Sequence, residues 1–204
     1  VDNADRVLFG SAKGNNSGND HSAALAQIAA SQKFSAANLS LMKRMAETAS
    51  PKIMPTRTTE DEQYYVVYAG SDAFRDLKAD TTIVQAQRDA LDRGENNPIF
   101  SGGDIVYDGC IVKKIVDIPA VGNVGASSAT VAPVYLCGAQ AIGFAIAKKT
   151  TSKTEEFDYG DKQGVAIEEI RGIEKMLFGS GSSDVADLQD HGVMTAYQAA
   201  AADA

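Results

Sequence analysis

The strongest periodic pattern of hydrophobic and polar positions lies between residues 35 and 49, where apolar side chains recur every three or four residues. That spacing places them on one face of a helix. The face consists of Leu39, Met42, Ala46 and Ala49, with Leu41 and Met45 beside it. Ser35 can act as the N-cap, and Pro51 and Pro55 end the pattern. The sequence therefore predicts a helix over residues 35–49.

Weaker patterns predict further helices. Residues 21–32 are rich in alanine, and residues 71–77 begin with Ser71, a favourable N-cap residue. A longer helix is predicted over residues 80–94. Asp80 or Thr81 would cap the N-terminus of this helix.

Runs of aromatic and β-branched residues predict strands at residues 64–70, 131–138 and 191–199. Residues 104–118 predict two more strands, because Asp108-Gly109 separates "IVY" from "CIV" and this pair is a strong signal for a tight hairpin. Between these elements, the Gly/Ser-rich residues 121–130 predict an exposed loop.

Three consecutive segments are harder to interpret. Residues 139–149 predict a short helix, although Gly143 weakens it, and the polar residues 150–164 predict a loop or an irregular edge. Residues 165–178 favour a helix by periodicity alone. The helical face would be Ile167, Ile170, Ile173 and Leu177.

Composition excludes several classes of protein. The chain has 204 residues and a net charge of −8, and its basic residues occur at most in pairs. A nucleic-acid-binding protein needs a basic surface, so sequence-specific DNA binding is not expected. No apolar stretch approaches the roughly 18 residues of a membrane span, so no membrane contact is expected. The two cysteines, Cys110 and Cys137, predict buried free thiols and favour a cytoplasmic origin.

Reactive constellations are also absent from the sequence. "FGSAKGNNS" contains glycines and a lysine but lacks the Gly-Lys-Ser/Thr order of a phosphate-binding loop. His21 and His191 have no zinc-ligand spacing with the cysteines, and Asp104 and Asp108 are explained by turn formation. We therefore predict no catalytic residue, no cofactor and no metal. The alternative is an α+β enzyme or small-ligand-binding domain with its site in the loop from Asn96 to Asp108.

Several ordered segments resemble a known family. The more specific ones are "FRDLK", "NPIFSGGD", "CGAQA" and "IEEIRGIEK". Together they resemble the C-terminal part of the major capsid proteins of tailed, double-stranded-DNA bacteriophages, in the group related to the N-four-like podophages. The resemblance covers nearly the whole chain.

The resemblance implies the α+β Hong-Kong-97-type capsid fold, with an axial (A) domain and part of a peripheral (P) domain. Residues 63–147 would form the A domain. Residues 1–62, with an N-terminal loop and helix, and residues 148–204 would belong to the P domain. Family members carry an arm, an extended loop and a spine helix upstream, so we expect this chain to be a fragment. The resemblance also makes residues 165–178 a strand, and we follow it there against the periodicity.

The function implied by the resemblance is structural. The protein would self-assemble as pentamers and hexamers into the icosahedral head of a virion, enclosing DNA, after assembly in the host bacterial cytoplasm. Portal, scaffold and decoration proteins are further candidate partners, and a decoration protein that attaches to a preformed shell is a third possibility for the chain itself. The candidate subunit-contact residues are Arg75, Asp76, Lys78, Glu168, Glu169 and Arg171.

Overall fold

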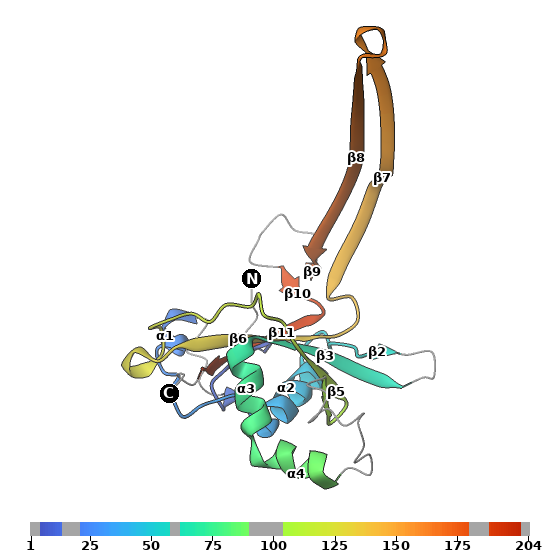
Figure 1. Cartoon of the computed structure of the whole chain (residues 1–204). Coiled ribbons are helices and arrows are strands. Elements are labelled where there is room, and N and C mark those ends of the chain that lie inside the picture. The colour runs from blue at the N-terminus through green and yellow to red at the C-terminus, as the bar shows by residue number, and fades with distance from the viewer. Residues whose placement is uncertain (1–4, 14–20, 58–61, 90–103, 180–187, 201–204) are drawn as a thin grey trace.

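The computed structural model describes residues 5–13, 21–57, 62–89, 104–179 and 188–200. A mixed β-sheet with most of its helices against one side forms the body of the molecule, and a long two-stranded hairpin projects from the other side (Figure 1). The predicted α+β class is confirmed.

Seven strands form the sheet of the body, in the order β1-β11-β6-β3-β5-β4, and β2 pairs with the start of β3. The β1–β11 and β3–β5 pairs are parallel and the others are antiparallel. The strands are β1 (Val7–Phe9), β2 (Thr56–Arg57), β3 (Gln63–Ala69), β4 (Ile105–Tyr107), β5 (Cys110–Lys114), β6 (Val131–Cys137) and β11 (Val193–Ala199). The strands predicted near residues 64–70, 131–138 and 191–199 are therefore confirmed.

The predicted hairpin at Asp108-Gly109 is also present. Both residues have positive φ, 49° and 71°, as a tight two-residue turn requires. The Asp108 carboxylate accepts hydrogen bonds from Ser40 Oγ at 2.9 Å and Lys43 Nζ at 3.0 Å. These bonds dock the turn on helix α2 (Ala36–Thr48).

The predicted helix at residues 35–49 is confirmed as α2, and Ser35 Oγ caps it by accepting from the Asn38 backbone N–H at 3.4 Å. Helix α1 (His21–Leu25) is shorter than the predicted 21–32, because turns follow it and carry Ile28 into a small apolar cluster. The predicted end of the helix over residues 80–94 lies outside the described residues.

Helices α3 (Ser71–Ala79) and α4 (Thr81–Asp89) are joined at Asp80. The prediction of Ser71 as N-cap is wrong: Gly70 is the cap residue of α3, without a side-chain hydrogen bond, and Ser71 begins the helix. Asp80 caps two helices at once. Its carboxylate accepts from the Thr82 N–H at 2.7 Å and from the Ala36 N–H at 3.0 Å.

The core lies between α2, α3 and one face of the sheet. Leu39, Met42 and Ala46 from α2 are fully buried, as the helical pattern predicted, and they belong to one cluster with Val67 of β3. Strand β1 alternates between two clusters: Leu8 joins the main core, while Val7 and Phe9 join a second cluster with Ile28. Both faces of the sheet are therefore covered at the β1 edge.

The long hairpin contradicts three predictions. Strand β7 (Ile142–Phe157), the 3-10 turn η3 (Asp158–Gly160) and β8 (Lys162–Lys175) replace the helix predicted at 139–149 and the polar loop predicted at 150–164. The helix favoured by the periodicity of residues 165–178 is also wrong, and the strand implied by the resemblance is confirmed. Glu169 and Arg171 lie on the same face of β8 as Ile167 and Ile173, and they break the alternation of apolar and polar residues that is typical of a strand.

The sheet contains strands from both of the predicted domains. Strands β1 and β11 come from the segments predicted as P domain, yet they pair in one sheet with β6 and β3 from residues 63–147. The division into A and P domains stays a prediction.

Residues 121–130 form the predicted irregular segment, with a single turn η2 (Ala126–Ser128).

Candidate assembly surface

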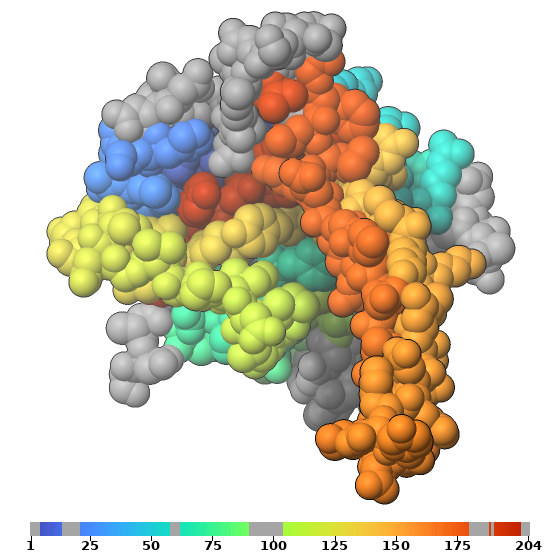
Figure 2. Space-filling view, turned by 90° about the horizontal axis from the view of Figure 1, so that it is seen from above, coloured from blue at the N-terminus to red at the C-terminus, as the bar shows by residue number. Residues whose placement is uncertain are grey.

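The β7–β8 hairpin is the part of the molecule with the largest reach. Strand β7 has 16 residues and β8 has 14, so the hairpin is about 50 Å long at roughly 3.3 Å per residue. Figure 1 shows it projecting from the sheet, and Figure 2 shows it in orange on the face seen from above, with its tip extending past the body. Most exposed large apolar side chains among the described residues lie on it.

The register of the hairpin places the apolar side chains on one face. Ile142, Phe144 and Ile146 pair across the ladder with Lys175, Ile173 and Arg171, and cross-strand partners share a face. The two register shifts add residues to β7 only, so β8 alternates without interruption. We call the following set the apolar face, in which each side chain is more than half exposed: Ile142, Phe144, Ile146, Val165, Ile167 and Ile173.

The opposite face of the hairpin is more polar. It carries Glu168, whose carboxylate forms an ion pair with Lys148 and lies 4.0 Å from Lys153 Nζ. Ile170 and Phe157 are the large apolar side chains on this face that are at least half exposed, within the described residues. The hairpin therefore has one face suited to burial and one suited to water or to polar contacts.

The hairpin is joined to the body by backbone and ionic contacts at its root. Lys175 Nζ, at the end of β8, lies 2.8 Å from Asp190 Oδ1 in β10 (Gln189–Asp190). The Met176 N–H donates to the Ala141 carbonyl at 3.1 Å. Strand β9 (Leu177–Phe178) then pairs with β10. These contacts determine the direction in which the hairpin leaves the sheet.

A buried arginine supports the same region. Arg6 is 1% exposed, and its guanidinium donates to the His191 carbonyl at 3.0 Å and to the Pro51 carbonyl. Burial lowers the pKa of Arg6, and the nearby carboxylates of Asp5 and Asp190 oppose that shift. Arg6 thus links three distant parts of the chain beneath the root of the hairpin.

An apolar groove of about 390 Å³ lies where the apolar face meets the sheet. Ile142 and Ile173 of the hairpin form one side. Tyr68 and Tyr135, which are paired on β3 and β6, belong to the other side. The groove and the apolar face are therefore continuous.

The predicted contact residues fall into two separate groups. Glu168, Glu169 and Arg171 all lie on strand β8 of the hairpin. Arg171 Nη1 lies 3.5 Å from Glu169 Oε1 on the same face as the apolar row, while Glu168 is on the opposite face. The second group is on α3 in the body: Arg75, Asp76 and Lys78.

The three side chains of the α3 group differ from one another in their exposure to solvent. Arg75 Nε lies 3.6 Å from Asp76 Oδ1, and the side chain of Asp76 is only 7% exposed. Lys78 is exposed. The structure does not bring the two groups together, and their role as contacts stays a prediction.

At the alternative site, the carboxylates of Asp104 and Asp108 each contact a lysine side chain. Asp108 is bound by Ser40 and Lys43, and the Lys43 hydrogen bond lowers the pKa of Asp108. Asp104 lies 3.3 Å from Lys113 Nζ. Residues 96–103 of that loop lie outside the described residues. Among the residues that are described, no group of three or more His, Cys, Asp or Glu could hold a metal.

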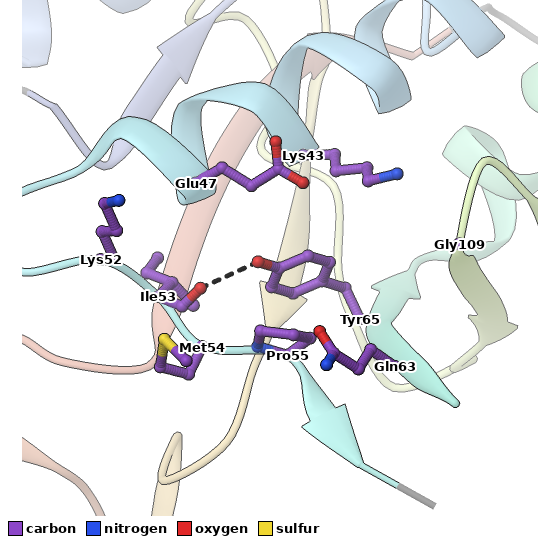
Figure 3. A pocket seen from close by; sticks show the side chains of 9 residues that line it. All are labelled: Lys43, Glu47, Lys52, Ile53, Met54, Pro55, Gln63, Tyr65 and Gly109. Atoms are coloured by element: carbon purple, nitrogen blue, oxygen red, sulfur yellow. Dashed lines mark hydrogen bonds between the residues drawn. The ribbon is translucent and has the colours of Figure 1, made fainter. Parts of the chain in front are cut away.

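A second cavity, of about 350 Å³, lies between α2 and the start of β3 (Figure 3). Its polar lining residues are Lys43, Glu47, Lys52, Gln63 and Tyr65. Tyr65 donates its hydroxyl hydrogen to the Ile53 carbonyl at 2.9 Å, and burial raises its pKa. None of the described residues that line it is a histidine, cysteine or serine.

Sequence reasoning missed the apolar face. A signal was present, because Ile142, Phe144 and Ile146 alternate with smaller residues at the period of a strand. Val165 and Ile167 repeat the alternation on β8. The prediction of a helix over residues 139–149 concealed it.

The fold combines a well-packed sheet with a long projecting hairpin that exposes apolar side chains, as a surface for packing against other polypeptide would. Comparison with known proteins identifies the family of this chain. Residues 2–202 match the family model described as phage capsid protein. The chain belongs to the phage capsid protein family.

A curated relative agrees with this assignment. The chain is 31% identical over 190 residues to the major capsid protein of Pseudomonas phage KPP25. The aligned region covers 87% of this chain and 48% of the relative. The chain therefore spans about half the length of the curated relative that it matches. The enzyme alternative finds no support, since this family is structural.

Solved capsids share the fold. The capsid asymmetric unit of cyanophage Pam1 contains a chain that is 33% identical and superposes with a TM-score of 0.82, covering 98% of this chain and 56% of that one. The capsid of Ralstonia phage GP4 matches with a TM-score of 0.68 and 22% identity, covering all of this chain and 55% of that one.

Within the described residues, no helix is long and apolar enough to span a membrane.

Proposed function

We propose that this chain is part of a major capsid protein that self-assembles, as pentamers and hexamers, into the icosahedral head enclosing the double-stranded DNA of a tailed phage. Assembly would take place in the cytoplasm of the host bacterium. Portal, scaffold and decoration proteins are candidate additional partners. In this proposal residues 63–147 form the A domain, and residues 1–62 and 148–204 belong to the P domain.

One observation carries the proposal: nearly the whole chain superposes on the cyanophage Pam1 capsid protein, with the TM-score of 0.82. The reach of the β7–β8 hairpin supports it physically. Copies in a closed ring contact each other through two different surfaces, and a projecting element supplies one of them. The net charge of −8 suits a wall that encloses DNA without binding it tightly.

The charged groups on α3 and on the hairpin are the proposed contacts between copies. Arg75 and Lys78 would meet an acidic surface of a neighbour, and Glu168, Glu169 and Arg171 would form polar contacts along the hairpin. Such contacts specify partners and orientation more than they add affinity.

The test uses the full-length polypeptide that carries this chain, purified and viewed by electron microscopy. We expect closed shells. Small soluble oligomers alone, under conditions in which related capsids assemble, would contradict the proposed function. A double variant, Arg75→Glu with Lys78→Glu, should reduce shell yield, while Lys52→Glu serves as a control at an exposed lysine outside the proposed contacts. Normal yield from the double variant would reject the α3 contact only.

A further inference from the structure

We propose that the tip of the β7–β8 hairpin docks on the corner between helices α3 and α4 of a second copy of this chain, with Tyr159 as its anchor. The tip is defined as residues 155–161. The inference deepens the proposed function and rests on it, because it names the acidic surface that Arg75 and Lys78 of a neighbouring copy would meet.

The side chain at the end of the hairpin is the first argument. Tyr159 lies in the turn η3 between the two strands and is fully exposed, and Phe157 beside the turn is 50% exposed. Tyrosine is enriched among the few residues that contribute most of the binding energy of an interface. Tyr159 therefore has the chemistry of an anchor residue.

The backbone of the turn is the second argument. Asp158 and Tyr159 have φ of 59° and 58°, in the left-handed region. Glycine, asparagine and aspartate adopt this region more readily, whereas a bulky residue there is uncommon and costs free energy. Folding of the turn therefore does not explain why a tyrosine stands at this position, and a contact with another molecule does.

The charge of the tip is the third argument. Glu155, Glu156 and Asp161 are exposed, while Asp158 pairs with Lys162 at 3.0 Å. The tip thus presents several carboxylates around an exposed aromatic ring. Complementary charge steers such a surface to a basic partner and fixes its orientation.

The position of the hairpin makes the partner a second copy. The hairpin is about 50 Å long and projects from the side of the sheet opposite to α3 and α4 (Figure 1). The tip therefore does not reach the helices of its own copy. A contact between tip and helices joins two copies through two different surfaces, and such a contact can close a ring.

The corner between α3 and α4 offers a complementary surface. Two exposed cations, Lys78 and Arg88, belong to these helices. A hollow of about 670 Å³ lies at the same corner, lined by Ala79, Thr81, Val84, Gln85, Arg88 and Asp89. Its size accommodates an aromatic side chain, and the two cations are opposite in charge to the tip.

The lining gives each part of the tyrosine a partner. In the docked arrangement the ring packs on Ala79 and Val84. The guanidinium of Arg88 supplies a cation–π contact with the face of the ring. Asp89 can accept the hydrogen bond of the tyrosine hydroxyl, so the carboxylate in the hollow also has a role.

The first test separates the stability of the turn from assembly. In the full-length protein, Tyr159→Asn should leave the midpoint of thermal unfolding unchanged or higher, since asparagine suits the left-handed backbone. The same variant should lower the yield of shells by about tenfold or more, because the anchor is lost. Tyr159→Phe is the control and should assemble within about threefold of the native protein, since it keeps the ring. Native yield from Tyr159→Asn would overturn the proposal.

The second test exchanges charge between the two surfaces. Glu156→Lys with Asp161→Lys on the tip should lower shell yield, and so should Lys78→Glu with Arg88→Glu on the helices. The four substitutions together should restore most of the yield, because opposite charges face each other again. As a control, the tip variant combined with Lys52→Glu should stay low. A fourfold variant that folds but assembles no better than either pair would overturn the proposal.

The third test locates the contact directly and keeps the aromatic ring. The photoreactive residue p-benzoylphenylalanine replaces Tyr159, the assembled protein is irradiated, and mass spectrometry identifies the cross-linked peptide. We expect cross-links to residues 78–89 of another copy. Cross-links to the tip of another copy, or to the cavity between α2 and β3, would overturn the proposal.

Electron microscopy of the same preparations separates this proposal from the proposed function. Cross-links from position 159 to residues 78–89 within small oligomers that never form shells would preserve the docking inference and reject the function. Native shells whose cross-links lie elsewhere would do the reverse.

Discussion

Lys175 Nζ lies 2.8 Å from Asp190 Oδ1, although the side chain of Asp190 is only 3% exposed. The pair connects the last residue of β8 to β10 and so joins the hairpin to the body. A carboxylate removed from water needs a cation nearby, and the charge of Arg6 also acts on Asp190. Lys175 is therefore expected to stabilise the fold more than a surface ion pair does.

Replacing Lys175 with methionine tests this relationship. We expect the free energy of unfolding of the full-length protein to fall by about 1–3 kcal/mol, because Asp190 loses a partner while Arg6 remains. Urea denaturation measures the change. The control is Lys162→Met, which removes a contact of 3.0 Å to Asp158 on the exposed tip and should change little. Equal effects of both substitutions would contradict a special role for Lys175.

The Lys43–Asp108 pair predicts a pH dependence of stability. The Lys43 hydrogen bond lowers the pKa of Asp108 from its ordinary 3.8, so this stabilisation is present above about pH 4 and is lost as the pH falls through the lower value of the folded state. The Asp108 hydrogen bond raises the pKa of Lys43 above 10.5, so its share is lost only in more alkaline solution.

Comparison of the native protein with Asp108→Asn isolates this effect, since asparagine tolerates the positive φ of the turn. The native protein should be more stable by up to about 1 kcal/mol between pH 5 and pH 9, because both side chains are partly exposed to water. The difference should shrink below pH 4. A difference that stays constant down to pH 2 would show that Asp108 does not stabilise the fold through its charge.

Gly192 predicts a steric requirement at the hairpin root. A Cβ atom added there would lie 2.6 Å from the Ala141 N and 2.7 Å from the Ala139 carbonyl oxygen, both of them backbone atoms. Gly192→Ala should therefore destabilise the protein by roughly 1–3 kcal/mol. Gly172→Ala on β8 is the control, because its added Cβ meets nothing within 4 Å. Thermal unfolding that ranks the two variants in the opposite order would reject the close packing at the root.

The two free thiols predict different reactivities. Burial raises the pKa of Cys110 to about 12 and that of Cys137 to about 11, so at pH 8 only about one Cys110 in ten thousand is a thiolate. Iodoacetamide should modify both residues rapidly in urea and slowly in the native protein. Cys137, which is less buried, should react first. Rapid modification of Cys110 in the native state would contradict its burial in the core.

Local patterns were sufficient for the elements of the body. The helical spacing of Leu39, Met42 and Ala46 predicted α2, and Asp108-Gly109 predicted the β4–β5 turn, because the interactions that form them lie within a few residues. The absence of catalytic motifs and the family resemblance likewise came from the residues alone. The contacts between copies proposed for Arg75, Lys78 and Arg171 remain predictions.

Tertiary structure decided the hairpin and the surface that it presents. Residues 165–178 carry a helical spacing of isoleucines, yet they pair with residues 142–157 because cross-strand hydrogen bonds satisfy the backbone of both segments. The ion pair of Lys175 with the buried Asp190 joins positions 15 residues apart through packing that no local pattern encodes. Sequence by itself determined the short-range elements and the class of protein. The apolar face and the direction of the hairpin depend on register and on contacts between distant segments, which only the folded chain brings together.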